Sequence, residues 1–472
     1  MAELSRRGLL RAAALLPAAG AVGSTVGCGG NAGIVSLRPT VRVAVTWSAG
    51  ELQAFRSVLN GLGPREYSVE MMPFGDDIST ALGTRATGRP DVVLLPRPGL
   101  VADRLDALEP LPPTVAERWR YARIWDDLLF HRGPGNAGGR QPYGVPFKIA
   151  HKSAVWYRTD VFAAYGIEPP RSWSEWREIN ARLIRLGRTP LALAGGDGWA
   201  LTDFFENVLL ASARDTYDRL AAPSLPRPWT SPAVRRALRL LGRMWSPQGA
   251  LAGGARRCMV LQFQDALLEV FRYGRAAMVV VPDFAELVIN RFAADPSTVG
   301  VFTFPAVDGD DEDPVPGPHA PPVVVGGDVA VLAKPSNRHA RDLVTRLATP
   351  TAPLPWINPD GGRGADSRST SHGGGFIAAH LDTPMTEYSR RLRPLAERLA
   401  RPAGRMLRFD LSDRVGPVGS TQGMFRVLQD FLENVGDGGT DRVSAAADDA
   451  ARRLRGVEDR LIEDRDRGSG HG

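Results

Sequence analysis

Between residues 41 and 95, apolar runs of strand length alternate with runs of helical length, and this alternation limits the fold more than any other feature of the chain. Val41–Trp47 predicts a buried strand, and a helix is expected over 51–62. A second strand over 67–72, a helix over 77–87 and a third strand over 91–95 follow at similar spacing. This order and spacing are typical of an open, mainly parallel α/β sheet.

In such a sheet, ligands bind beyond the carboxyl ends of the strands, which places candidate ligand loops at 46–51 and 96–99. No Gly-x-Gly-x-x-Gly or Walker-type loop follows any predicted strand, so a nucleotide cofactor is not expected. The seven histidines are scattered without His-x-x-x-His spacing, and no Cys-x-x-Cys pair occurs. We therefore expect neither a cofactor nor a metal site.

The first 28 residues have the layout of an export signal. The twin-arginine pair Arg6–Arg7 precedes an apolar run over 9–26, which is too short and too rich in alanine and glycine for a spanning helix. Cys28 ends a segment that resembles a bacterial lipobox, although Thr25 stands where a large apolar residue is usual. A buried N-terminal helix is the competing interpretation. We expect a twin-arginine-type lipoprotein signal over 1–27, a lipidated Cys28 anchored to the cell membrane, and a tether over 28–39.

The cysteines and the charge distribution indicate which disulfides and binding partners to expect. If Cys28 carries lipid, Cys258 has no partner, because the chain holds only two cysteines, and no internal disulfide forms. The formal net charge of +6 is spread without a basic cluster, and basic residues do not alternate with aromatic ones, so nucleic acid is not an expected partner. Lysine occurs only at 148, 152 and 334, and the excess of arginine is not read as a functional signal.

Several segments between about Val41 and Leu454 carry motifs that recur together in one known family. They are Pro90–Leu94 with Leu105–Leu111, Tyr143–Phe147 with Val155–Phe162, Gly166–Trp176, Gly274–Met278, Phe304–Pro305, Gly198–Asn207 and Thr421–Phe425. The set resembles extracellular solute-binding proteins of ABC importers, specifically the carbohydrate-type group (solute-binding protein family 1). No single motif is specific, but the ordered set is. Within Gly166–Trp176, Ser172 replaces the usual threonine, and the last two segments are similar to the α-glucoside-like branch.

The resemblance implies a two-lobed, periplasmic-binding-protein-like α/β fold, with hinge crossings and a ligand cleft between the lobes. The hinge would lie near 143–157 and 322–332, with a third crossing around 405–413. The lobes would comprise 40–145 with 325–405 (lobe 1) and 146–324 with 406–460 (lobe 2), followed by a flexible tail over 461–472. Closure on a ligand would select one arrangement of the lobes.

The resemblance also implies a function. We expect an exported, monomeric solute-binding protein that captures a sugar or oligosaccharide and delivers it to ABC transporter permease subunits, without being an enzyme. One alternative is an exported glycoside-acting enzyme, which would need two carboxylates about 5–10 Å apart around a cleft. No Gly-x-Ser-x-Gly motif occurs to support nucleophilic catalysis. A sugar sensor with the same fold that serves no transport is the other alternative.

Sugars present C–H faces, which stack on aromatic rings, and hydroxyl groups, which bind carboxylates, amides and guanidinium groups. We selected ligand-binding candidates on that basis from strand ends, loops and the hinge. Asp283 and Phe284 follow a predicted strand where the resembled family often has a tryptophan. The candidates are Trp47, Glu51, Arg97, Lys148, Trp199, Asp203, Asp283, Phe284, Asp328 and Phe425.

Most of these candidates have a structural alternative. Trp47 could cap the sheet as a core residue, and Trp199 could pack within its helix. Glu51 could serve only the helix dipole, and Asp203 could serve only as a helix cap. Arg97 could be solvated surface.

Overall fold

The computed structural model describes residues 38–47, 49–83, 88–133, 139–223, 225–315, 323–359, 374–400 and 407–469. The chain divides into two compact units, Met1–Arg38 and Pro39–Gly472, and every described helix and strand belongs to the second unit. The expected signal, Cys28 and the tether up to residue 37 lie outside the described residues. Within the described ranges, none of the helices is both long and apolar enough to cross a membrane.

A seven-stranded sheet forms the first lobe, in the order β13-β12-β3-β1-β2, with β4 and β7 also paired to β12. β1 runs parallel to β2 and β3, whereas β12 runs antiparallel to β3 and β7. Every residue of β12 is buried, as expected for a strand that is covered on both faces. The strands are β1 (Thr40–Val45), β2 (Ser68–Pro73), β3 (Val92–Leu95), β4 (Leu108–Glu109), β7 (Val145–His151), β12 (Val323–Ala333) and β13 (Leu407–Phe409).

The strand predictions over residues 41–95 are confirmed, and so is the first helix. The second predicted helix is a 3₁₀ helix, η1 (Gly75–Leu82). Short helices and a small hairpin complete this lobe. They are α1 (Ala49–Gly61), α2 (Leu100–Asp103), α3 (Pro113–Glu117), α4 (Asp126–Leu129), α13 (Arg338–Leu347), α14 (Leu354–Ile357) and α15 (Arg393–Ala400), with β5 (Phe130–His131) paired to β6 (Gln141–Pro142).

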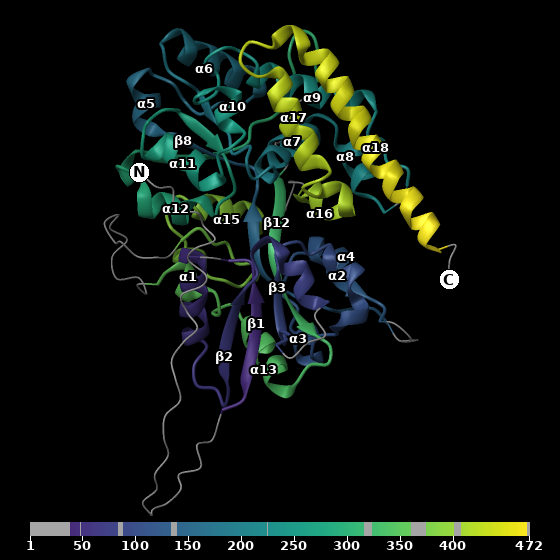
Figure 1. The fold of residues 1–472 in the computed structure, drawn as a ribbon. Coiled ribbons are helices and arrows are strands. Elements are labelled where there is room, and N and C mark those ends of the chain that lie inside the picture. The colour runs from purple at the N-terminus through teal and green to yellow at the C-terminus, as the bar shows by residue number, and fades with distance from the viewer. Residues whose placement is uncertain are drawn as a thin grey trace, which may run out of the picture. The chain divides into compact units, whose positions relative to one another are not determined.

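A four-stranded sheet forms the second lobe, in the order β11-β8-β10-β9. Its strands are β8 (Ala154–Arg158), β9 (Leu191–Ala192), β10 (Met278–Val280) and β11 (Val299–Thr303). Figure 1 shows the helices of this lobe gathered around the sheet, with the yellow C-terminal helices on one side. They are α5 (Thr159–Ala164), α6 (Trp173–Arg185), α7 (Trp199–Ser212), α8 (Arg214–Ala221), α9 (Pro232–Trp245), α10 (Gly254–Cys258), α11 (Phe263–Phe271), α12 (Ala285–Phe292), α16 (Leu411–Arg414), α17 (Met424–Val435) and α18 (Val443–Ser469).

The chain passes between the two sheets at three places. The first crossing is the turn at Lys152–Ser153, between β7 and β8; the second leads from β11 into β12; the third is at Asp410, between β13 and α16. Each falls in or next to a range in which the sequence predicted a hinge. The first sheet includes three segments that the sequence assigned to the second lobe: β7 to His151, the start of β12 at Val323, and β13, which was predicted within 406–460.

The buried apolar residues form two clusters, each of which combines early and late parts of the chain. The first cluster extends from the first sheet into β10, α11 and α12 of the second lobe. In the first lobe, β1 and β3 pack with β12 and with Trp356 of α14. In the second lobe, side chains of α7 and α9 pack with Phe431 of α17 and Leu454 of α18. The helix α18 continues to Ser469, past residue 461, where the sequence analysis placed a flexible tail.

Candidate functional site

A buried lysine of the first lobe lies at the centre of a charged cluster. Lys148, on β7, is 3% exposed, and its Nζ lies 3.5 Å from Oε1 of Glu51 in the first turn of α1. Asp328 is the register partner of Lys148 on β12. Burial lowers the pKa of the Lys148 ammonium, but the charges of Glu51, Asp328 and Asp283 outweigh burial and raise that pKa above its ordinary value. Lys148 therefore stays protonated.

A group of three aromatic rings of the second lobe meets this lysine through one member, Phe284. Trp199 opens α7, Phe263 opens α11, and Phe284 directly precedes α12. Their ring centroids are 5.5–5.8 Å apart, and the Lys148 Nζ lies 4.8 Å from the centroid of Phe284. All three rings are partly exposed, so they offer apolar surface beside a charged cluster from the other lobe. We call Trp199, Phe263 and Phe284 the aromatic trio.

A second lysine, whose side chain is 15% exposed, holds a separate cluster at the hinge. The Lys152 Nζ lies 3.0 Å from Oδ1 of Asp203 on α7 and also pairs with Oδ2 of Asp410. Burial raises the pKa of Asp203 to about 7 despite Lys152, whereas Lys152 holds the pKa of Asp410 below its ordinary value. The charge of Lys152 also acts on Asp328, so Asp328 lies between the two lysine clusters.

Two carboxylates at these clusters have an oxygen without a partner. Oδ2 of Asp203 and Oδ2 of Asp283 are buried and have no hydrogen-bond partner among the described residues. The other oxygen of Asp283 accepts the backbone N–H of His151 at 2.5 Å. Burial raises the pKa of Asp283, like that of Asp203, to about 7. An unpaired buried acceptor is costly.

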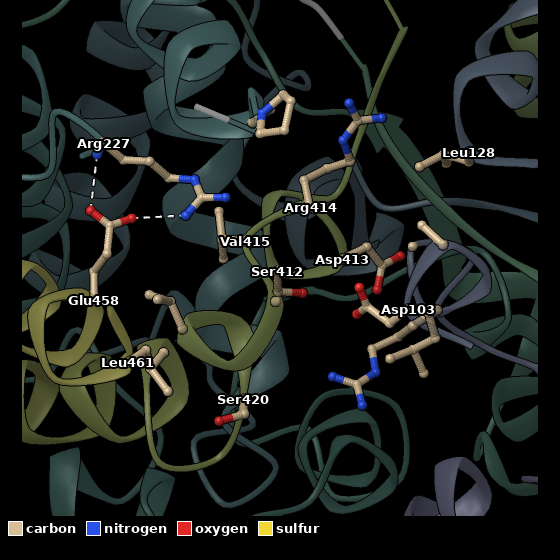
Figure 2. Close-up of a pocket in the computed structure, with 18 of the residues that line it drawn as sticks. Asp103, Leu128, Arg227, Ser412, Asp413, Arg414, Val415, Ser420, Glu458 and Leu461 are labelled. Carbon is tan, nitrogen blue, oxygen red and sulfur yellow. Dashed lines mark hydrogen bonds and ion pairs between the residues drawn. The ribbon is translucent and has the colours of Figure 1, made fainter. Parts of the chain in front are cut away.

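A groove of about 1140 Å³ lies where α2 and α4 of the first lobe face α16 and α18 of the second. Arg97 lines it, and so do Asp103, Ser412 and Asp413. Figure 2 shows Asp103 and Asp413 among the residues that line the groove, with Arg227 bound to Glu458 farther along. Gly99 approaches α16 so closely that a Cβ atom there would lie 2.1 Å from the Asp413 carbonyl oxygen, so only glycine fits.

Six of the ten predicted ligand-binding residues gather around Lys148. Of the others, Asp203 belongs to the Lys152 cluster and Arg97 to the groove. Trp47 is 4% exposed and packs against Phe55, Phe147 and Trp356, which favours its interpretation as a core residue. Phe425, on α17, is half-buried and lies against Gly198. The six are Glu51, Lys148, Trp199, Asp283, Phe284 and Asp328.

The sequence analysis missed Phe263, Lys152, Asp410 and Asp413. For Lys152 a signal existed, because it lies four residues after Lys148 in a chain with only three lysines. Phe263 gave no such signal, since its role depends on the approach of α7 and α12 in space. Within the described ranges, no group of His, Cys, Asp and Glu is arranged to hold a metal ion.

Comparison with known proteins identifies the family. The family model for bacterial extracellular solute-binding proteins matches residues 74–228. The osmoprotective compounds-binding protein GgtB of Synechocystis sp. is 30% identical over 366 residues, which is 73% of this chain and 77% of that protein. The alpha-glucosides-binding periplasmic protein AglE of Rhizobium meliloti is 32% identical over 197 residues, or 39% of this chain and 42% of that protein.

Solved structures show the same two-lobed fold. The bacterial solute receptor AcbH, described as having an exclusive preference for β-D-galactopyranose, superposes with a TM-score of 0.65 at 18% identity over 89% of this chain and all of that one. The maltose-bound MalE3 of T. maritima superposes with a TM-score of 0.63 at 16% identity, over 88% of this chain and 99% of that one. The predicted fold class is therefore confirmed. The extent of the match to GgtB, together with the family model, shows that this chain belongs to the bacterial extracellular solute-binding protein family.

Proposed function

We propose that this protein captures a neutral sugar, as a glycoside or oligosaccharide, between its two lobes and delivers it to an ABC transporter permease. Its membership of an extracellular solute-binding family supports a role outside the cytoplasm. A lipid on Cys28 would hold it at the membrane. This part of the proposal rests on the sequence alone and predicts that Cys28→Ser releases the protein from the membrane fraction.

The main support for the proposal is the aromatic trio, which faces the Lys148 cluster. Partly exposed rings at centroid distances of 5.5–5.8 Å offer apolar surface to the C–H faces of a sugar. The carboxylate of Glu51, whose side chain is 28% exposed, can accept a sugar hydroxyl. The single positive charge of Lys148 lies among three carboxyl groups, those of Glu51, Asp283 and Asp328, which disfavours an anionic solute.

The second polar cluster and the groove suggest that the solute extends beyond one ring. The charges of Lys148 and Lys152 act to lower the pKa of Asp328, and those of Lys152 and Arg97 act to lower the pKa of Asp413. Polar groups therefore continue from the aromatic trio towards the groove of about 1140 Å³. The names of the relatives, one for alpha-glucosides and one for osmoprotective compounds, make glucosides such as trehalose, sucrose and maltose the first probes.

The test is isothermal titration of the chain with maltose, trehalose, sucrose and galactose, and with glycine betaine as a non-sugar osmolyte. A solute at 100 times its dissociation constant should also stabilise the fold by about 2.7 kcal/mol, which a thermal shift assay detects. Trp199→Ala should weaken sugar binding by roughly tenfold, since an aromatic contact contributes about 1 kcal/mol beyond its buried area. Because Trp199 is partly exposed, we expect little loss of thermal stability.

Tyr273→Ala is the matched control, because Tyr273 is an exposed aromatic residue at the end of α11 in the same lobe. We expect it to leave sugar affinity unchanged. If Trp199→Ala loses stability but keeps its affinity, the aromatic trio is a packing feature and the site lies elsewhere. Binding of betaine alone would refute the sugar assignment, and release of glucose from any probe would favour the enzyme alternative.

A further inference from the structure

A single side chain contacts all three segments that connect the lobes. Lys152 belongs to the first crossing, between β7 and β8. Its stem lies on Gly326 of β12, where a Cβ atom would come within 2.7 Å of the Lys152 Cε. Its ammonium pairs with Asp410, which directly follows β13 at the third crossing. The ammonium therefore lies where the three connections converge.

Backbone hydrogen bonds hold the three crossings together around this lysine. The Lys152 N–H donates to the Val324 carbonyl at 2.9 Å, and the Val324 N–H donates to Oγ of Ser153 at 2.9 Å. The Asp410 N–H donates to the Val325 carbonyl at 2.8 Å. Loss of the Lys152–Asp410 pair would therefore act on hydrogen bonds in all three crossings together.

The same ammonium is joined to the solute site through α7. Lys152 lies 3.0 Å from Oδ1 of Asp203, which is completely buried. Asp203 follows Trp199 by four residues, so it lies one helical turn beyond the tryptophan of the aromatic trio, on the same face of α7. The Asn207 amide, one further turn along, donates to the Lys152 carbonyl at 3.0 Å. Through α7, the position of Lys152 therefore affects the position of Trp199.

The chemistry of this position suits lysine better than arginine. Only three of the 58 basic residues in the chain are lysine, and two of them, Lys148 and Lys152, lie in this hinge strand and its turn. A compact ammonium on a slender stem fits above Gly326 between two carboxylates, whereas a planar guanidinium fork is wider.

We propose that Lys152 is a positioning residue for solute capture, which ties the three crossings to α7 and so sets the closed arrangement of the lobes and the placement of Trp199. Lys152 acts through Asp410, Asp203 and the crossing strands, and it need not touch the solute. The inference rests on the proposed function, because the lobe arrangement matters for capture only if a solute binds between the lobes. Residues that act through such a network change binding by about 0.5–2 kcal/mol without contacting the ligand, which is roughly a two- to thirtyfold change in affinity.

The test compares Lys152→Met with Lys334→Met, which removes an exposed lysine of the first lobe. Amide hydrogen exchange is first measured on the solute-free chain, over 151–154, 323–326 and 407–411 and over the two lobe cores. Lys152→Met should speed exchange in all three crossings by roughly tenfold and leave the lobe cores unchanged. Lys334→Met should change neither. Unchanged exchange at the crossings would overturn the inference.

Maltose titration of the same variants then measures the consequence for capture. We expect Lys152→Met to bind maltose, or whichever probe sugar binds the unmodified chain, roughly tenfold more weakly. Full affinity with loosened crossings would overturn the positioning role. If Lys152→Met does not fold, Lys152→Met/Asp410→Asn removes both charges and keeps the helix-capping oxygen of residue 410, and the same two outcomes apply. If no probe sugar binds the unmodified chain, the proposed function fails, whereas the hydrogen exchange still decides whether Lys152 joins the crossings.

Discussion

Replacing Lys148 with methionine should destabilise the protein, and the loss should grow with pH. The change keeps the length and apolar character of the stem and removes the ammonium. That ammonium lies 3.5 Å from a Glu51 oxygen and 4.8 Å from the Phe284 ring centroid. Breaking a buried pair costs about 3–5 kcal/mol, and because the Glu51 side chain is 28% exposed we expect about 2–3 kcal/mol near pH 6.

The pH dependence comes from Asp283 and Asp328. Burial raises the pKa of each from an ordinary value of 3.8 to about 7 in the folded protein, and Lys148 opposes that rise. A carboxyl whose pKa is higher in the folded than in the unfolded protein lowers the free energy of unfolding as pH increases from the unfolded pKa to the folded pKa. Above the folded pKa it causes no further loss. Without Lys148 both folded pKa values rise further, so the variant continues to lose stability above pH 7, where the unmodified chain does not. At about pH 8.5 the added loss is up to about 2 kcal/mol for each carboxyl.

Urea unfolding, followed by circular dichroism near pH 6 and near pH 8.5, measures the loss in free energy of unfolding and its pH dependence. Lys334→Met is the control, and as a change at an exposed position it should stay within about 0.5 kcal/mol at both pH values. An equal loss for Lys148→Met at the two pH values would refute the assignment of Asp283 and Asp328 to the field of this lysine. A loss below about 1 kcal/mol at both would refute the buried ion pair itself.

Two further predictions concern other parts of the molecule. Glu458→Ala should lower the free energy of unfolding by about 3–5 kcal/mol, because it leaves Arg227 buried without its 2.8 Å ion pair; Glu463→Ala, on the same helix but 69% exposed, should cost less than about 0.5 kcal/mol. Burial raises the pKa of the Cys258 thiol to about 11, so Ellman's reagent at neutral pH should leave it unmodified in the folded protein and react with it in urea. Rapid modification of one thiol in the folded protein would then report a Cys28 without lipid, and modification of two would contradict the burial of Cys258.

Local pattern was enough to predict the framework of the first lobe. The runs at 41–47, 67–72 and 91–95 are apolar enough to identify buried strands, and parallel strands direct their carboxyl ends to one edge of a sheet. That rule accounts for Glu51, which follows the first strand, whereas Lys148 and Asp283 reach the same place from the hinge strand β7 and from the second sheet. The resemblance to a known family supplied the second lobe and the crossings, which periodicity alone did not order.

The direction of individual side chains could not be predicted from the sequence. Trp47 follows a strand, as a ligand residue would, but its ring packs with Trp356 of α14, and nothing local to either residue predicts that contact. Phe263 belongs to the aromatic trio only because α11 begins beside Phe284 in space. Lys152 gains its role from Asp410, 258 residues away along the chain. Such pairings depend on how the crossings bring distant segments together.

Because both lobes take elements from early and late parts of the chain, neither can be finished before its last segments are made. The first sheet is incomplete without β12 and β13, and the second core is incomplete without α17 and α18. No single cut would therefore release a self-sufficient lobe, and a nascent chain that stops before residue 400 would expose apolar surface on both. The two lobes should therefore assemble as one late event in folding.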